Sequence, residues 1–167
     1  GAEVFVHMTP SVKLPTIRAE FVRAASDAER NMLRNGGFEE GLVDYPPRGW
    51  SVPHGRKDAL SWPEWTQESP LEGKSCVRFR RIVEYMGLNS QPLKTLRAGK
   101  YVVRFATKGD ATCGSVQVMM QGRAVGSKNI EPSADWTRHE IPVELGVGLV
   151  DVRFRMSTGG PDEQVLW

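Results

Sequence analysis

Short runs of alternating apolar and polar residues, separated by Gly, Pro, Asn and Asp, make up the sequence from Asn31 onward. The clearest runs are residues 77–80, 101–105, 116–120, 139–144 and 150–155. A period of two places the apolar side chains of each run on one face, as in a strand with a core on one side and water on the other. Roughly seven to nine such strands predict an all-β fold in which two antiparallel sheets pack as a β-sandwich, with jelly roll topology as the leading candidate.

The composition argues against two classes of protein, those that bind nucleic acid through bulk charge and those that span a membrane. The chain of 167 residues contains 17 Gly and 11 Pro, scattered rather than periodic, which favours tight turns over long helices. Its 22 Lys and Arg against 20 Asp and Glu leave a formal charge of +2, which argues against nucleic-acid binding through bulk charge. No apolar run reaches the roughly 18 residues needed to cross a bilayer. We therefore expect no nucleic-acid partner and no membrane span, and we expect ligand specificity to come from local chemistry.

The first 29 residues lack the regular alternation of the rest. We interpret residues 1–29 as a linker or the tail of a preceding domain, and residues 30–167 as one folded domain. Within the first segment, the spacing of apolar residues over Lys13–Ala24 fits either a strand or a short helix. No signal-peptide pattern opens the sequence, so we expect a fragment of a longer protein.

Catalytic and metal-thiolate motifs are absent from the sequence. Cys76 and Cys113 have no zinc-ligand spacing, and we expect two buried free thiols, with a single disulfide as the alternative. Gly73-Lys74-Ser75 lacks the preceding glycine of a phosphate-binding loop. The acidic residues between positions 58 and 72 favour a solvated loop over a glycosidase-like carboxylate pair; they are Asp58, Glu64, Glu68 and Glu72. The chain is therefore predicted not to be an enzyme.

A set of ordered motifs resembles one known family. Asn31–Gly41 (NMLRNGGFEEG) followed by Pro47–Trp50 (PRGW) resembles the opening of carbohydrate-binding modules of the family 4, 9 and 22 kind, which are galactose-binding-domain-like jelly rolls. Further landmarks follow in the family's order; they are Gly73–Phe79, Leu96–Tyr101 and Asp135–Thr137. The resemblance covers about Asn31 to Trp167. Such modules usually finish on a strand that carries an acidic pair, whereas this sequence departs from the pattern at its end and stops at Trp167.

The opening motif carries two expectations. From the residues themselves, Asn35-Gly36-Gly37 predicts a backbone with positive φ that bends the chain before Phe38 enters the core. The resemblance implies that Glu39 helps to hold one structural Ca²⁺ together with backbone carbonyls near Gly73. A surface Glu39 without a metal is the alternative, because Ca²⁺ needs about six to eight oxygen ligands.

Sugars present apolar C–H faces and hydroxyl rims, so their binding sites combine aromatic platforms with planar polar groups. Trp62 and Trp65 flank Pro63-Glu64, where the strand pattern does not require both indoles for the core. We therefore expect either an exposed sugar platform or a pair in which one Trp closes the core. Tyr85 and Gln91 are candidates to flank this platform, whereas Trp50 and Trp136 are predicted to be structural.

Arginine occupies many of the polar strand positions. These residues are Arg78, Arg80, Arg104, Arg153 and Arg155. Gln117 and Met119 are expected in the middle strand of the sheet that forms a groove, whichever sheet that is. A guanidinium group binds carboxylates or sulfates in two-point geometry, so an arginine-lined face suits an acidic or sulfated glycan. The alternative, which we favour, is a solvated face with cross-strand partners such as Asp151, Glu140 and Glu144.

The resemblance and these residues together predict a non-catalytic carbohydrate-binding module. It would hold a polysaccharide or oligosaccharide for a tethered glycan-degrading enzyme, as one domain of a secreted or cell-surface, bacterial polypeptide. The alternative is a structural or interaction β-sandwich domain without its own sugar site, since fold does not fix function. A hydrolase or lyase is the weakest hypothesis.

Overall fold

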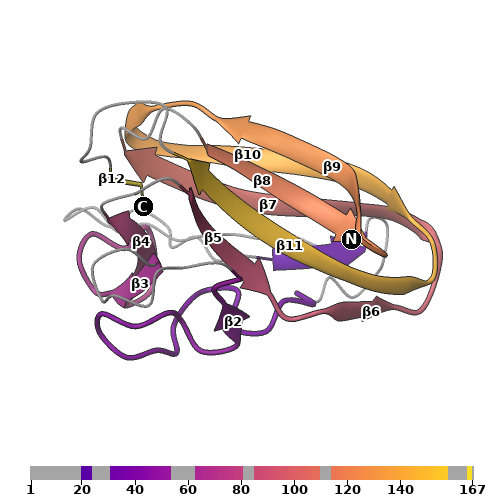
Figure 1. Cartoon of the computed structure of the whole chain (residues 1–167), viewed down its shortest axis with the longest axis horizontal. Helices are drawn as coiled ribbons and strands as arrows, with labels where there is room; N and C mark the ends of the chain where they lie inside the picture. Colours follow the sequence, from indigo (N-terminus) through magenta and orange to yellow (C-terminus); the bar gives the residue numbers. More distant parts are fainter. Residues whose placement is uncertain are drawn as a thin grey trace.

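The computed structural model describes the backbone of residues 20–23, 31–53, 63–80, 85–109, 114–157 and 165–166, and this part of the chain consists of strands and loops without a helix. The first sheet contains β1 (Glu20–Arg23), β3 (Pro63–Thr66), β4 (Cys76–Arg80), β7 (Gly99–Gly109), β10 (Ser133–Leu145) and β12 (Val165–Leu166). The second sheet contains β2 (Trp50–Ser51), β5 (Tyr85–Ser90), β6 (Leu93–Thr95), β8 (Gly114–Met120), β9 (Arg123–Ile130) and β11 (Gly148–Ser157). The predicted all-β, two-sheet jelly roll is confirmed (Figure 1).

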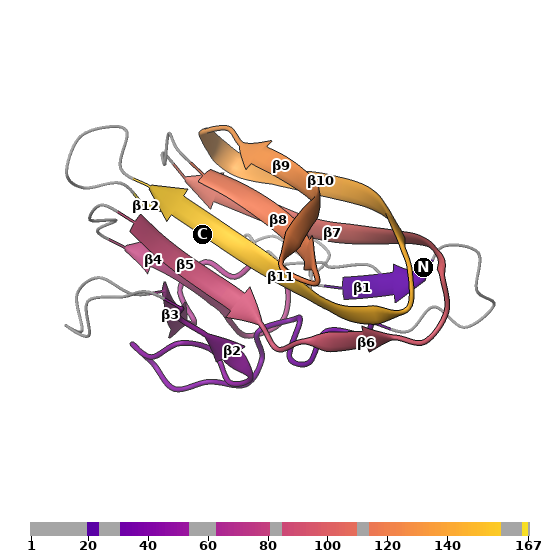
Figure 2. The ribbon, with the colours of Figure 1, turned by 45° about the vertical axis from the view of Figure 1, so that its right-hand side comes forward.

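All pairings between these strands are antiparallel. The first sheet has the order β1-β7-β12-β4-β3, with β10 also paired to β7, and the second has the order β2-β5-β11-β8-β9, with β6 also paired to β11. The long strands run along the long axis of the molecule, whereas β3 lies toward one end, β6 toward the other, and β2 between them (Figures 1 and 2). Strand β3 is therefore an edge strand at the end opposite β6.

The alternating residues predicted to face inward form the core between the sheets. On β7, β8 and β11 the buried positions recur at every second residue, as at Val103 and Phe105, Val116 and Val118, and Val152 and Phe154. A shift of one residue would expose each of these sets, so the hydrophobic pattern fixes the register. Trp50 is also buried, as predicted, with its ring centroid 5.0 Å from that of Phe38 and 5.9 Å from that of Phe154. Trp136 is partly buried against the core.

The opening motif bends before Phe38 as predicted, but the positive φ angles do not lie on its two glycines. Positive φ angles occur at Asn35 (49°) and Phe38 (55°), and not at Gly36 or Gly37. Asparagine tolerates the left-handed region because its short amide can bond locally. The Asn35 Nδ2 group donates to the carbonyl oxygens of Glu40 (2.7 Å) and Arg48 (2.8 Å), and its Oδ1 atom accepts the Glu40 N–H (3.0 Å). The asparagine side chain, rather than glycine freedom, therefore holds this loop together.

Part of the segment expected to be a linker joins the first sheet. Residues Glu20–Arg23 form β1 and pair with Tyr101–Arg104 of β7, which selects the strand alternative for this part of Lys13–Ala24. The rest of residues 1–29 lies outside the described residues, so the expected domain boundary stays a prediction. Cys76 is a buried free thiol, as predicted, and Cys113 lies outside the described residues.

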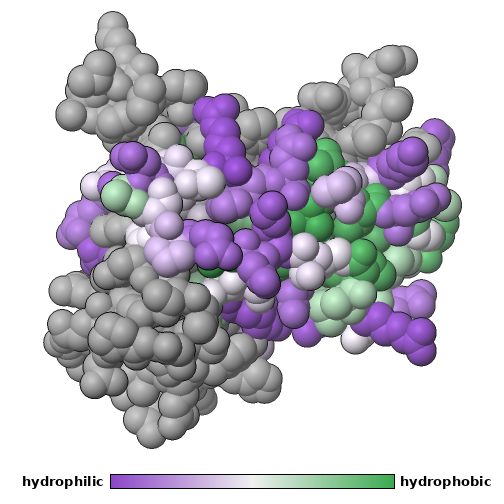
Figure 3. Space-filling model, turned by 90° about the horizontal axis from the view of Figure 1, so that it is seen from above, coloured by the Kyte–Doolittle hydropathy of each residue, from purple (hydrophilic) through white to green (hydrophobic). Residues whose placement is uncertain are grey.

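One face of the described part of the molecule is mostly polar (Figure 3). Seen from above the view of Figure 1, it is largely hydrophilic, and its hydrophobic residues gather toward the right-hand end (Figure 3). Within the described residues, the structure contains no helix that is both long and apolar enough to span a membrane.

Candidate functional site

The outer face of the second sheet carries a continuous row of polar side chains. Cross-strand pairing aligns one residue from each of five neighbouring strands; the row is Ser51 (β2), Asn89 (β5), Arg153 (β11), Gln117 (β8) and Ser127 (β9). On β2, β5, β8 and β11 these positions alternate with buried residues, and on β9 the neighbouring Gly126 lies against Val143 and Ile141 of the first sheet, so the row belongs to the opposite face. Four strand spacings of about 4.8 Å give the row a length of about 19 Å. We call it the polar row.

A second line of residues runs beside the polar row. Gly87 pairs with Arg155, Arg155 with Ser115, and Ser115 with Asn129. A Cβ atom built on Gly87 would lie 2.7 Å from the Arg155 Nη1 atom, so the absence of a side chain there leaves room for the guanidinium group. Glycine at this position therefore lets Arg155 reach across β5.

Hydrogen bonds hold both guanidinium groups of this face in place. Arg153 donates from Nε to Asp151 Oδ2 (2.5 Å) and from Nη2 to Asp151 Oδ1 (3.3 Å). Arg155 donates from Nη1 to Asn89 Oδ1 (2.7 Å). These bonds fix the orientation of two planar donor groups before any ligand arrives, which reduces the entropy lost on binding.

The chemistry of the polar row suits a ligand with many hydroxyl groups. Amide and hydroxyl side chains both donate and accept hydrogen bonds, and a guanidinium group donates several in one plane. The Arg153 side chain is 30% exposed, and Asn89 and Gln117 are partly exposed. A neutral, extended polyol can therefore exchange hydrogen bonds with successive strands.

Sequence reasoning found only part of this face. Gln117 and both arginines of β11 were candidates, and the structure brings them together with Asn89, Ser51 and Ser127, which were missed. The run that contains Asn89, Tyr85–Ser90, lacks regular apolar alternation, so the period of two gave no signal there. Only the register with β11 places Asn89 beside Arg153.

The arginine candidates do not share one face, because Arg78, Arg80 and Arg104 belong to strands of the first sheet. Arg104 donates from Nε to Glu140 Oε1 (2.6 Å), which is the cross-strand pairing given as the alternative. The side chain of Arg80 lies outside the described set.

The expected solvent exposure of Arg78 is wrong. This residue is 8% exposed, and its guanidinium group contacts Glu64, itself 6% exposed, through Nε (2.6 Å) and Nη2 (2.5 Å) to Oε1. A further bond joins Arg78 Nη1 to the exposed carboxylate of Glu68. Burial disfavours the charged guanidinium group, but hydrogen bonds and the charges of Glu64 and Glu68 outweigh it and raise the pKa of Arg78 above its ordinary value.

The same contacts revise the interpretation of the acidic segment. A solvated acidic loop was expected, but Glu64 and Glu72 are buried, and Glu64 and Glu68 share Arg78. The two carboxylates and the single guanidinium group that bridges them form a structural ion cluster. Asp58 lies outside the described residues.

The aromatic candidates are also separated. Trp65 is 8% exposed, and its indole N–H donates to the Phe38 carbonyl oxygen (2.6 Å), so it is not an open platform. Trp62 lies outside the described residues. Tyr85 begins β5 and pairs with Ser157, whereas the exposed Gln91 follows the other end of β5, about 20 Å away along an extended strand. Trp65 lies on the first sheet, whereas β5 belongs to the second, and the side chain of Tyr85 lies outside the described set.

Glu39 has the position expected from its motif, beside Gly73. A Cβ atom on Gly73 would lie 1.8 Å from Glu39 Oε1, and the Lys74 N–H donates to Glu39 Oε2 (3.0 Å). Gly73 has a φ of 69°, so its backbone also requires glycine. Among the described residues, no three His, Cys, Asp or Glu side chains gather as a metal site. One carboxylate that already accepts an N–H does not make up a calcium shell, so the structural Ca²⁺ stays a prediction.

Comparisons with known proteins support the fold. No protein-family model matches the sequence, and no curated protein matches it. Among solved structures, TmCBM61 in complex with beta-1,4-galactotriose has a TM-score of 0.63 and 22% identity over 83% of this chain and 93% of that chain. A structure described as "CBM4 structure and function" has a TM-score of 0.56 and 15% identity, covering 80% and 94%.

A protein named as an enzyme has a similar fold. A cyclase from Fischerella sp. TAU has a TM-score of 0.63 and 14% identity, covering 80% of this chain and 90% of that chain. At these identities the likeness shows the fold alone. The chain therefore has a fold like that of carbohydrate-binding modules, without assignment to family 4, 9 or 22.

Proposed function

We propose that this domain binds a polysaccharide along the polar row without breaking a bond in it. The observation that carries the proposal is the alignment of Ser51, Asn89, Arg153, Gln117 and Ser127 across five strands. A polymer of hydroxylated rings laid across the strands would meet a hydrogen-bonding side chain at each strand. The fold likeness to TmCBM61, whose complex contains galactotriose, and to the CBM4 structure supports this choice of ligand class.

The charges of this face favour a neutral or acidic glycan over a basic one. Asp151 is paired with Arg153, and Arg155 is held by an amide and carries a positive charge on the same strand. In this proposal the domain belongs to a secreted or cell-surface protein. A tethered enzyme would gain effective substrate concentration from it, because linking converts the second encounter into an intramolecular one.

Affinity gel electrophoresis against a panel of neutral and acidic polysaccharides tests the proposal. Gln117→Ala removes a partly exposed amide, and we expect its binding to fall about two- to tenfold, the effect of one lost hydrogen bond. Arg153→Ala removes a charged donor, and we expect a loss of about tenfold or more. Arg104→Ala on the first sheet is the matched control, because it is also a partly exposed, ion-paired arginine on a strand.

Two results would overturn the proposal. One is a wild-type domain that no polysaccharide in the panel retards. The other is retardation that Gln117→Ala and Arg153→Ala leave unchanged, or that Arg104→Ala lowers equally. Thermal unfolding of each variant separates lost binding from lost folding.

A further inference from the structure

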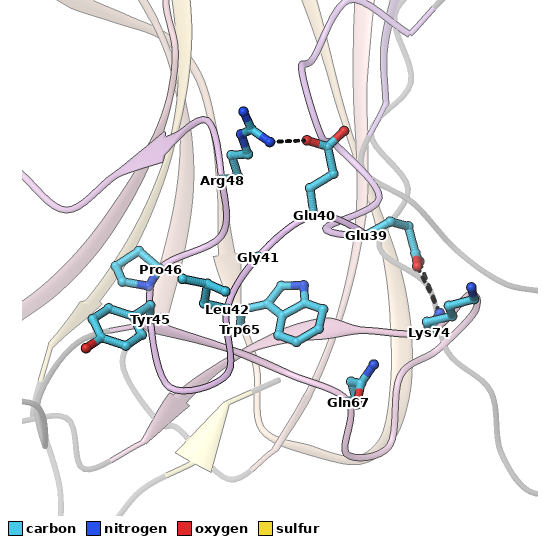
Figure 4. Close-up of a pocket in the computed structure, with 10 residues that line it drawn as sticks. All are labelled: Glu39, Glu40, Gly41, Leu42, Tyr45, Pro46, Arg48, Trp65, Gln67 and Lys74. Carbon is cyan, nitrogen blue, oxygen red and sulfur yellow. Dashed lines mark hydrogen bonds and ion pairs between the residues drawn. The ribbon is translucent and has the colours of Figure 1, made fainter.

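A pocket of about 720 Å³ opens beside β3, on the sheet opposite to the polar row (Figure 4). Its volume is within the range of roughly 300–1,000 Å³ typical of small-molecule sites. The loop after Phe38 supplies most of its wall, and Trp65, Gln67 and Lys74 supply the rest. Figure 4 shows the Trp65 indole in the middle of these residues.

The backbone of this loop is fixed to β3. The Trp65 N–H donates to the Tyr45 carbonyl oxygen (2.6 Å), and the Asp44 N–H donates to the Trp65 carbonyl oxygen (3.3 Å). Val43 forms a parallel bridge with Trp65. A Cβ atom on Gly41 would lie 2.4 Å from the Trp65 Cγ atom, so the indole packs directly on the glycine backbone. The pocket wall is therefore pre-formed rather than assembled by a ligand.

Large apolar side chains remain exposed on this fixed loop. Leu42 is 71% exposed and Tyr45 is 55% exposed, and both line the pocket with Pro46 and Trp65. Exposed apolar groups around a concave, polar-rimmed surface indicate a binding site. The aromatic ring of Tyr45 and the side chain of Leu42 match the apolar C–H face of a sugar ring.

The polar rim carries balanced charges. Arg48 Nη1 lies 3.8 Å from Glu40 Oε2, and the Glu39 carboxylate lies beside Lys74, whose backbone N–H it accepts. The two carboxylates and two cations that line the pocket cancel, so its field favours a neutral ligand over an anion. The carboxylates and the exposed Gln67 amide are acceptors for hydroxyl groups.

We propose that this pocket is a second binding site that takes one neutral sugar ring, at the end or a branch of a glycan. The choice of a sugar rests on the proposed function, but the site is separate from the polar row. Two sites on opposite sheets would let one domain hold two glycan segments, which raises avidity without new contacts at either site.

Titration with galactose, glucose and xylose, followed by ¹H–¹⁵N spectra of the full chain, tests this proposal. We expect at least one of these sugars to shift the backbone signals of Leu42, Tyr45 and Gln67. Tyr45→Ala should weaken that binding about three- to tenfold, since it removes the stacking surface. Val43→Ser is the matched control, because Val43 lies in the same loop and is 56% exposed but does not line the pocket.

The outcomes separate this proposal from the proposed function. No shift at the pocket with any of the three sugars, or shifts that Tyr45→Ala leaves unchanged, would overturn the second site. In that case the polar row would still be supported if polysaccharide in the affinity gel slows the wild-type domain and Gln117→Ala reduces this retardation. The opposite result is also informative. If a monosaccharide shifts backbone signals in a way that depends on Tyr45, but no polysaccharide binds along the polar row, the pocket is a sugar site and the proposed function of the row is overturned.

Discussion

Removing the buried Arg78 should destabilise the domain far more than removing the partly exposed Arg104. The Arg78 side chain is 10% exposed and that of Glu64 is 8% exposed, and their atoms approach to 2.5 Å. In Arg78→Met, the carboxylate of Glu64 stays buried without its partner. Breaking a buried ion pair in this way costs about 3–5 kcal/mol. That loss is a large share of the roughly 5–15 kcal/mol of stability of an ordinary domain.

Arg104→Met supplies the comparison. Arg104 donates to Glu140 at 2.6 Å, but the two side chains are 32% and 60% exposed. Solvent screens such a pair, so its loss should cost about 0–1 kcal/mol. The difference between the two variants therefore measures burial together with the additional contacts that Arg78 makes with Glu64 and Glu68.

Urea denaturation followed by circular dichroism measures both free energies of unfolding. A third variant, Arg78→Met with Glu64→Met, removes the buried charge as well, and it should regain about 1–3 kcal/mol over Arg78→Met alone. The reasoning is refuted if Arg78→Met and Arg104→Met differ by less than about 1 kcal/mol, or if the double variant is less stable than Arg78→Met.

Three further predictions concern single groups. Burial, together with the charge of Lys128, lowers the pKa of His139 below its ordinary value of 6.5, so the unfolded chain binds the proton first and stability should fall as the pH drops below about 6.5. His139→Gln should flatten this dependence in urea titrations at several pH values. Burial raises the pKa of the Cys76 thiol to about 12, so in a Cys113→Ser chain iodoacetamide should label Cys76 only after denaturant is added, as read by mass spectrometry. Glu39→Gln should lower the melting temperature by weakening the acceptor for a backbone N–H. A rise in melting temperature on adding Ca²⁺ that Glu39→Gln abolishes would support the structural Ca²⁺ that the sequence resemblance implies.

The core could be predicted because its signal is local. Alternation at Val116 and Val118, or at Val152 and Phe154, predicts both a strand and the face that is buried, and the structure agrees. The bend before Phe38 was predicted in place but not in detail, because the sequence does not say whether Asn35 or the glycines take the positive φ.

The site could not be predicted in the same way, because a polar residue on a strand has two possible environments. Arg78 and Arg153 have the same alternating pattern in sequence, yet one is buried between carboxylates and the other is partly exposed. What differs is the partners: Glu64 on the paired strand β3 and Glu68 after it contact Arg78, whereas Arg153 pairs with Asp151 of its own strand. Trp65 is a similar case, since its burial follows from a loop more than twenty residues earlier.

The polar row depends on the same register as the core. Strand β9 changes register between the pairs that involve Val118 and Met119, and Gln117 pairs with Ser127 before that irregularity. The row therefore lies where pairing with β8 and β11 is regular, and the side chains that fix this register are the buried ones on the other face. Any sequence that keeps the inward set keeps five outward positions in line, so the chemistry of those five positions can change without altering the fold. Inward positions set the fold and outward positions set the surface chemistry. A β-sandwich similar to those of binding modules and of a cyclase can therefore present different side chains on its outer face.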